Sequence, residues 1–271
     1  KTWTLRELRQ NFDAVFLAVG AGLPVFMNIP GEELKGVYSA NEFLTRVNLM
    51  KAHLEDYETP LPEVKDKQVI VIGGGNTAMD AARTAKRLGA HVTIVYRRTR
   101  DAMPVRVEEL HHALEEGIAL KVLRAPREFI GDEKTHFVTH TNLDVMELGE
   151  PDASGRRRPI PIEGSEYIID VDTVVVSVGV SPNPLIPQSV ENLDVSAWGT
   201  INVDKENMQT SIPDLFAGGD IVRGGATVIL AMGDGRKAAA YMDRYIKGKV
   251  RNILSLIREF STIGEILDFA R

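Results

Sequence analysis

The chain has 271 residues, a net charge of −6 and an isoelectric point near 5.6. A domain takes roughly 150 residues, so this length predicts about two domains, and the acidic balance argues against binding to nucleic acid. Cysteine is absent, which excludes disulfide bonds, a Cys-x-x-Cys redox pair and a cysteine-held zinc or iron–sulfur centre within these residues. No apolar run approaches the ~20 residues that a membrane-spanning helix needs.

Apolar, β-rich runs alternate with helical patterns along the first part of the chain, which is typical of α/β folds with a parallel sheet. A buried strand is predicted over residues 13–20. A helix is predicted over 39–50, with Ser39 as its N-cap and Glu42 completing a capping box. The polar stretch 53–66 contains two prolines and predicts a linker between domains.

A βαβ pattern follows this linker. Buried strands are predicted over 68–72 and 91–96, with a helix over 76–88 between them, and a further helix is predicted over 107–116. From residue 118 to residue 172 the pattern changes to short alternating segments with turns, which predicts an antiparallel excursion and not another βαβ unit.

The last part of the chain contains fewer strong signals. A buried strand is predicted over 173–179, a short strand over 215–217 and a long helix over 226–246. The tail from residue 251 to residue 271 is weakly amphipathic at helical spacing.

A glycine-rich motif of the form G-x-G-x-x-A joins the strand at 68–72 to the helix at 76–88. Gly73 permits a tight turn, Gly75 has no Cβ to keep a pyrophosphate away from the backbone, and Ala78 lets the helix pack closely on the strand. The helix N-terminus offers N–H groups and a positive dipole end to phosphates. The motif predicts a dinucleotide site formed by Gly73, Gly74, Gly75, Asn76, Thr77 and Ala78; the alternative is a glycine turn without a ligand.

The residues that end the next strand select the nucleotide. An NAD site usually places Asp or Glu about 20 residues after the motif, where it binds the ribose 2′-hydroxyl. Here the strand at 91–96 is followed by Arg97, Arg98 and Arg100, and guanidinium groups bind a 2′-phosphate through charge-assisted hydrogen bonds. This pattern favours NADPH over NADH; the alternative is a solvated basic loop.

A second motif, near residue 220, is typical of a flavin site. The short strand at 215–217 leads to Gly218 and Gly219, which let a cofactor pass close to the backbone, and Asp220 can accept hydrogen bonds from sugar or ribitol hydroxyls. The N–H groups that open the long helix can then face the flavin N1–C2 carbonyl edge. The alternative is a glycine turn with a capping Asp.

Several stretches form a combination that is specific to one family: residues 13–21, 71–83, 96–98, 103–104, 147–151, 217–220 and 235–239. Through them the chain resembles the FAD/NAD(P)-dependent oxidoreductases related to the small (beta) subunit of bacterial glutamate synthase, from about Phe12 to Gly248. The resemblance implies an NADPH domain inserted into an FAD domain, with hydride passing from NADPH to FAD and electrons then to iron–sulfur clusters. It places FAD contacts at Gly219, Asp220, Ala226 and Thr227.

Members of this family begin with a cysteine-rich iron–sulfur region and an FAD fingerprint of strand, G-x-G-x-x-G and helix, and neither precedes Phe12. We therefore expect weak or no FAD binding by this chain alone, because half a flavin site lacks its pyrophosphate anchor. The predicted α/β organisation is a Rossmann-like NADPH domain with an antiparallel β excursion, inserted into a partial FAD-binding domain and followed by a helical tail. The NADPH domain takes residues 63–185, the partial FAD domain 1–62 and 186–248, and the tail 249–271.

The expected chemistry belongs to the cofactors. Hydride transfer from nicotinamide to flavin needs the two rings to be positioned, so we expect neither a catalytic side chain nor a metal ligand here. Gly179, at the end of the strand predicted over 173–179, is a further expected cofactor contact.

The expected partner is a missing N-terminal half or a separate subunit that carries the iron–sulfur clusters. A glutamate synthase large subunit and a homodimer are candidates, whereas nucleic acid and membrane are not, and a cytoplasmic location is expected. The alternative function is a module that binds NADPH and docks to a partner without turnover. A disulfide reductase of the thioredoxin-reductase kind is disfavoured, because that class needs a Cys-x-x-Cys pair.

Other charged groups receive a structural interpretation. The run at 156–158 consists of three arginines and is interpreted as a solvated turn, with docking of an acidic redox partner as the alternative. Asp80 and Arg83 are interpreted as solvated helix charges, with a role at the domain interface as the alternative. His111 and His112 point to different helix faces, so they are interpreted as part of a solvated face, with a metal site as the alternative.

Overall fold

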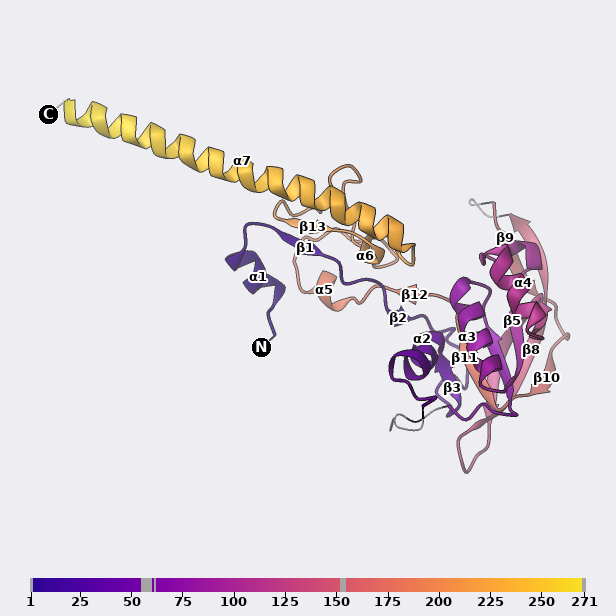
Figure 1. The fold of residues 1–271 in the computed structure, drawn as a ribbon. Coiled ribbons are helices and arrows are strands. Elements are labelled where there is room, and N and C mark those ends of the chain that lie inside the picture. The colour runs from indigo at the N-terminus through magenta and orange to yellow at the C-terminus, as the bar shows by residue number, and fades with distance from the viewer. Residues whose placement is uncertain (1, 55–59, 61, 152–154, 270–271) are drawn as a thin grey trace. The chain divides into compact units, whose positions relative to one another are not determined.

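The computed structural model describes residues 2–54, 60, 62–151 and 155–269, and the chain forms two compact units (Figure 1). Residues Pro24–Gly179 form one of them, which we call the continuous unit. Residues Lys1–Leu23 and Val180–Arg271 form the other, the discontinuous unit.

The continuous unit begins earlier than the domain boundary predicted between residues 62 and 63. The reason is that strand β3 (Val37–Ser39) pairs in parallel with β11 (Thr173–Val176) and so belongs to the same sheet as the later strands. The unit ends at Gly179, before the boundary predicted after residue 185. The linker predicted over 53–66 lies partly outside the described residues.

A five-stranded parallel sheet forms the centre of the continuous unit. Its strand order is β3, β11, β4 (Gln68–Ile72), β5 (His91–Tyr96) and β6 (Ala119–Val122). Strands β4 and β5 have the predicted bounds, because both are buried apolar runs with clear turn residues on either side.

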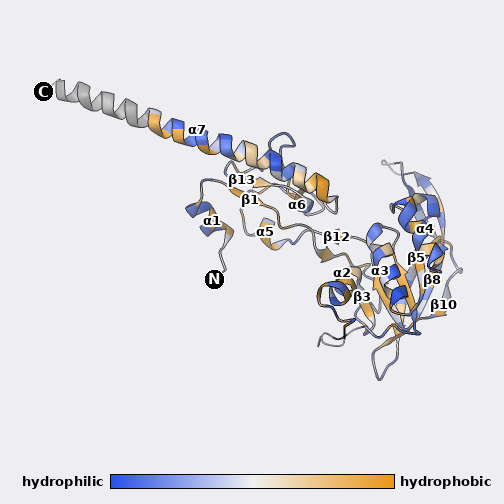
Figure 2. Cartoon of the chain, in the orientation of Figure 1, coloured by the Kyte–Doolittle hydropathy of each residue, from blue (hydrophilic) through white to orange (hydrophobic). Residues whose placement is uncertain are grey.

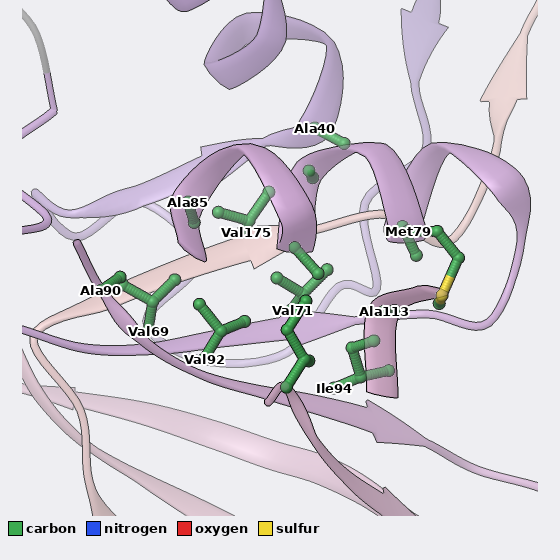
Figure 3. Packing of buried hydrophobic residues seen from close by; sticks show 14 of the residues in the cluster. Ala40, Val69, Val71, Met79, Ala85, Ala90, Val92, Ile94, Ala113 and Val175 are labelled. Atoms are coloured by element: carbon green, nitrogen blue, oxygen red, sulfur yellow. The ribbon is translucent and has the colours of Figure 1, made fainter. Parts of the chain in front are cut away.

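Both faces of this sheet are covered, and alternate residues of β4 point to opposite sides. Val69 and Val71 belong to one core cluster with the alanines of α3 (Asn76–Arg87) and with residues of α4 (Val107–Glu115), part of which Figure 3 shows. Ile70 and Ile72 instead join a second cluster with residues of the antiparallel strands. The helical layer also contains α2 (Ala40–Leu44), where Ser39 Oγ accepts a 3.1 Å hydrogen bond from the Glu42 backbone N–H.

The helix predicted over 39–50 is therefore present, but its second half is a π-helical turn, η1 (Thr45–Leu49). The predicted antiparallel excursion is confirmed by strands β7 to β10. Strand β8 (Val138–Pro151) pairs with the other three: β7 (Arg124–Gly131), β9 (Arg157–Pro161) and β10 (Tyr167–Asp170).

The discontinuous unit has a smaller sheet. Strand β1 (Val15–Leu17) pairs in parallel with β13 (Leu215–Ala217), and the two strands pack on α1 (Leu5–Asn11) through a core that includes Leu5 and Ile221. The strand predicted over 13–20 is thus shorter than expected. Short helices α5 (Leu185–Gln188) and α6 (Asp220–Arg223) complete this unit, together with helix α7 (Val228–Phe269). Strands β2 (Leu23–Pro24) and β12 (Val180–Ser181) pair with each other.

Helix α7 runs without interruption from Val228 to Phe269. The sequence predicted a helix over 226–246 and a separate helical tail, and this division is wrong, because the glycine at 248 does not end the helix. The first turn of α7 is strongly apolar in Figure 2, and Val228 and Ile229 are 75% and 80% exposed.

Candidate cofactor sites

The turn between β4 and α3 requires glycine at its first two positions. Gly73 has a φ of 143°, and a Cβ there would lie 2.2 Å from the Ser177 carbonyl oxygen. A Cβ at Gly74 would lie 2.6 Å from the ring of Tyr96. At Gly75, in contrast, a Cβ would have no atom within 4 Å, so this position borders open space. The turn is packed from behind and accessible in front, as a phosphate-binding turn must be.

The first residues of α3 leave donors available at this turn. Gly75 is the N-cap residue, and no side chain caps the helix. The carbonyl of Gly75 accepts from the N–H groups of Ala78 and Met79, whereas the N–H groups of Asn76 and Thr77 have no acceptor among the described residues. Free N–H groups at a helix N-terminus fit an anionic ligand.

Ala78 lies behind the turn and is fully buried between helix and sheet. It belongs to the core cluster with the other alanines of α3 and with Val71 and Ile94. Its small size permits this close packing, which is the role that the sequence predicted for it.

The loop after β5 that carries Arg97, Arg98 and Arg100, which we call the arginine loop, lies at the same edge of the sheet, because β4 and β5 are parallel neighbours. Two hydrogen bonds fix it there: the Tyr96 hydroxyl donates to the Ala102 carbonyl over 2.9 Å, and the Arg106 N–H donates to Asn76 Oδ1 over 3.1 Å. The second of these bonds links the loop directly to the glycine turn.

The three predicted arginines differ in their surroundings. The side chains of Arg97 and Arg100 are exposed and make neither a hydrogen bond nor an ion pair with another described residue. Arg98 is half-buried, and its Nε donates to the Arg157 carbonyl over 3.0 Å. Its terminal nitrogens Nη1 and Nη2 have no acceptor in the described chain, so two fork nitrogens remain for a ligand.

A groove of about 480 Å³ adjoins Arg98. One wall is formed by Arg98, Thr99 and residues 101–104, from the loop after β5, and the other by Leu148 and residues 155–157, from the hairpin of β8 and β9. The run at 156–158 is therefore not simply a solvated turn, since two of its arginines line a groove that Arg98 shares.

Gly179 follows β11 at the carboxyl edge of the same sheet. It is exposed, its φ is 131°, and a Cβ there would meet open space. Its carbonyl accepts a 3.1 Å hydrogen bond from the N–H of Val25. This places Gly179 on the same sheet edge as the glycine turn, because β11 is the direct parallel neighbour of β4.

The remaining predicted residues belong to the discontinuous unit. Strand β13 leads to Gly219, which is buried with a φ of 75°, and Asp220 then begins the four-residue helix α6. Asp220 Oδ1 accepts a 3.2 Å hydrogen bond from the N–H of Ala226. Ala226 and Thr227 are exposed and immediately precede α7. The predicted site residues thus form two groups, one in each unit.

Asp234, which was not among the residues predicted from the sequence, holds this second turn in place. Its carboxylate accepts from the Gly219 N–H over 3.1 Å and from two nitrogens of Arg223 over 2.6 Å each. The side chain is 1% exposed. Hydrogen bonds from Arg223 lower the pKa of Asp234 below its ordinary value, although burial opposes this. A lone acid between Gly233 and Gly235 in an apolar stretch of helix was the available signal.

The interpretation of Arg83 as a solvated helix charge is wrong. Arg83 bridges α3 and α4 through 2.8 Å ion pairs with both Glu109 and Glu116, and its side chain is 20% exposed. Burial acts to raise the pKa of Glu116, but hydrogen bonds from Arg83 and Arg87 hold it below the ordinary value. Asp80 shifts the other way, because burial and the charge of Glu109 raise its pKa.

His111 lies on an exposed face, 3.4 Å from Glu115. In the described ranges no group of three or more His, Asp or Glu side chains is arranged to hold a metal ion. Likewise, none of the helices within those ranges combines the length and apolarity of a membrane-spanning segment.

Comparison with known proteins bears directly on this arrangement. Residues 4–235 match the pyridine nucleotide-disulphide oxidoreductase family. The chain is 38% identical over 261 residues to the glutamate synthase (NADPH) small chain of Azospirillum brasilense, which covers 94% of this chain and 53% of the relative. It is 36% identical over 247 residues to the NADP(+)-dependent formate dehydrogenase subunit beta of Moorella thermoacetica, covering 90% of this chain and 33% of the relative. The chain therefore spans about half or less of these relatives.

Among solved structures, Mycobacterium tuberculosis FprA in complex with NADPH aligns with a TM-score of 0.73 at 22% identity, covering 92% of this chain and 67% of that chain. This likeness confirms the predicted α/β fold class, and the curated relatives confirm the resemblance to the glutamate synthase small subunit. The 271 residues contain no cysteine, so a disulfide redox pair is absent from them. Since the match extends over most of its length, the chain belongs to the pyridine nucleotide-disulphide oxidoreductase family.

Proposed function

We propose that this chain is the NADPH-binding part, and a portion of the FAD-binding part, of an NADPH-dependent flavoprotein oxidoreductase. One observation carries the proposal: a glycine turn with free helix N–H groups and a loop with unpaired guanidinium nitrogens lie on the same edge of one parallel sheet. The N–H groups fit a pyrophosphate, and the guanidinium groups fit a ribose 2′-phosphate.

The chain's own residues have binding and orienting roles in this proposal. Residues 73–78 hold the pyrophosphate, and Arg97, Arg98 and Arg100 hold the 2′-phosphate. Gly219, Asp220, Ala226 and Thr227 contribute one side of a flavin site, and Gly179 is a further cofactor contact. When bound, the nicotinamide and flavin supply the hydride chemistry.

The partner proposal follows from the relatives, which are named as a small chain and a beta subunit. We propose that electrons leave the flavin towards iron–sulfur centres on another segment or subunit, of which a glutamate synthase large subunit is one candidate. The second candidate function is a module that binds NADPH and docks to a partner without turnover by these 271 residues.

An absorbance experiment separates the two functions. The purified chain is mixed with FAD, passed over a desalting column, and its spectrum is recorded before and after anaerobic addition of NADPH. A retained flavin band that NADPH bleaches supports turnover by this chain. A colourless protein that still enhances NADPH fluorescence supports the binding module. Absence of NADPH binding would contradict both.

A further inference from the structure

We propose that Arg157 is a positioning residue for Arg98, so that the hairpin of β8 and β9 sets the preference for a 2′-phosphorylated nucleotide. This inference rests on the proposed binding of NADPH at the glycine turn. It assigns a role in cofactor selection to the antiparallel strands, which contribute to the unit's core but lie outside its parallel sheet.

One hydrogen bond joins the loop after β5 to the hairpin of β8 and β9. Arg98 Nε donates to the main-chain carbonyl of Arg157 over 3.0 Å, across 59 positions of sequence. A guanidinium held at Nε keeps its two terminal nitrogens directed away from that bond as a planar fork. Since Nη1 and Nη2 of Arg98 have no acceptor among the described residues, this fork is fixed in direction and free for a phosphate.

The side chain of Arg157 holds this part of its own strand, and with it the Arg157 carbonyl, in place. The Arg157 side chain reaches across the hairpin, where its Nε donates to the Gly149 carbonyl over 2.8 Å and its Nη2 to the Leu148 carbonyl over 2.6 Å. These acceptors lie at a register irregularity, because the pairing steps from Leu148 with Pro159 to Pro151 with Arg157. The side chain therefore braces a part of the ladder where regular backbone pairing is interrupted.

Arg98 and the hairpin of β8 and β9 line a common groove. The groove of about 480 Å³ is lined on one side by Arg98 and on the other by residues 155–157. Its size lies within the ~300–1,000 Å³ that is common for small-molecule sites. Arginines on both walls, against the single carboxylate of Asp101 among the lining residues, suit a dianionic phosphate monoester.

A neighbouring arginine provides a matched control. Arg158 carries the same charge one position later in β9, points to the opposite face of the strand and does not line the groove. Its side chain makes no hydrogen bond with another residue of the described chain. Arg157→Ala and Arg158→Ala thus change the net charge equally, but only Arg157→Ala removes the side-chain hydrogen bonds to Leu148 and Gly149.

The test measures binding of adenosine 2′,5′-bisphosphate and of 5′-AMP to the 271-residue chain by isothermal titration calorimetry. We expect Arg157→Ala to reduce the ratio of the two affinities about fivefold, because the variant retains the carbonyl but loses its support. Arg158→Ala should leave the ratio unchanged. Arg157→Lys keeps the charge but cannot donate from two fork nitrogens, so it should behave like Arg157→Ala.

Binding of 5′-AMP reports whether each variant still forms the glycine turn. An unchanged ratio in Arg157→Ala, or an equal reduction in Arg158→Ala, overturns the positioning role and leaves the proposed NADPH site intact. An Arg157→Lys variant that matches the original chain assigns the effect to charge and also overturns it. If the original chain binds both probes equally, the proposed NADPH preference fails together with this inference.

Discussion

At the scale of single residues, the glycine turn separates the demands of folding from those of binding. Position 73 requires glycine for two reasons: its φ is 143°, and a Cβ there would clash with the Ser177 backbone. Gly75 instead has an ordinary φ of −94° and faces open space. Gly73→Ala should lower the free energy of unfolding by about 3 kcal/mol or more, because it combines backbone strain with a steric clash.

Gly75→Ala is the matched variant. It should lower the free energy of unfolding by less than about 1 kcal/mol, the range for replacing an N-cap residue. It should nevertheless weaken NADPH binding, because the added Cβ keeps the pyrophosphate away from the backbone. Urea unfolding and NADPH fluorescence measure the two effects. Equal losses of stability in both variants would contradict this division.

The arginine loop makes a second prediction at this scale. Arg97→Ala removes an exposed guanidinium that has no protein acceptor in the described chain, so it should leave stability unchanged and weaken NADPH binding about tenfold. Binding of NADH, which lacks the 2′-phosphate, should stay the same. Arg87→Ala, on the same unit and 64% exposed, is the control and should affect neither nucleotide. A loss of NADH affinity in Arg97→Ala would assign the residue a different role.

At the scale of elements, Asp234 ties α7 to α6 and to the turn after β13. Because Arg223 lowers the folded-state pKa of Asp234, the ionised pair stabilises the protein above the ordinary value of 3.8, and this contribution is lost as the pH falls below 3.8 towards the folded pKa. Asp234→Asn should therefore destabilise the chain by about 3 kcal/mol at pH 5 to 7, and the difference should shrink below pH 3.8.

Urea unfolding at several pH values measures this difference. Asp243→Asn on the same helix removes an exposed ion pair with Lys247, so it should lower the free energy of unfolding by less than about 1 kcal/mol at every pH. A difference for Asp234→Asn that does not change between pH 7 and pH 3 would show that the carboxylate charge is not what stabilises the turn.

The elements also show how far sequence alone reaches. Strands β4 and β5 and the glycine turn were predicted with their bounds, because buried runs and phosphate-turn glycines are local signals. Helix α7 was divided wrongly, since a single glycine costs only about 1 kcal/mol in a helix and does not end it. Long-range bonds left no local signal: the contact of Arg98 with Arg157 spans 59 positions, and the ion pairs of Arg83 depend on how α3 packs on α4.

At the scale of the whole molecule, the two units differ in how complete their predicted sites are. The continuous unit contains every element of a dinucleotide turn, whereas the discontinuous unit contributes one glycine turn beside a two-stranded sheet. Three or more strands are usual for a stable sheet. We expect this chain to bind FAD weakly, with a dissociation constant above the micromolar range. Quenching of flavin fluorescence measures it, and a micromolar or smaller dissociation constant would contradict that expectation.

The central claim is that the turn at Gly73 and the arginines after β5 together select NADPH. The most direct measurement is calorimetric titration of the 271-residue chain with NADPH and with NADH under the same conditions. NADPH should bind at least about tenfold more tightly, because the two ligands differ only in the 2′-phosphate, which can accept charge-assisted hydrogen bonds from the arginines. Equal affinities, or tighter binding of NADH, would contradict the account.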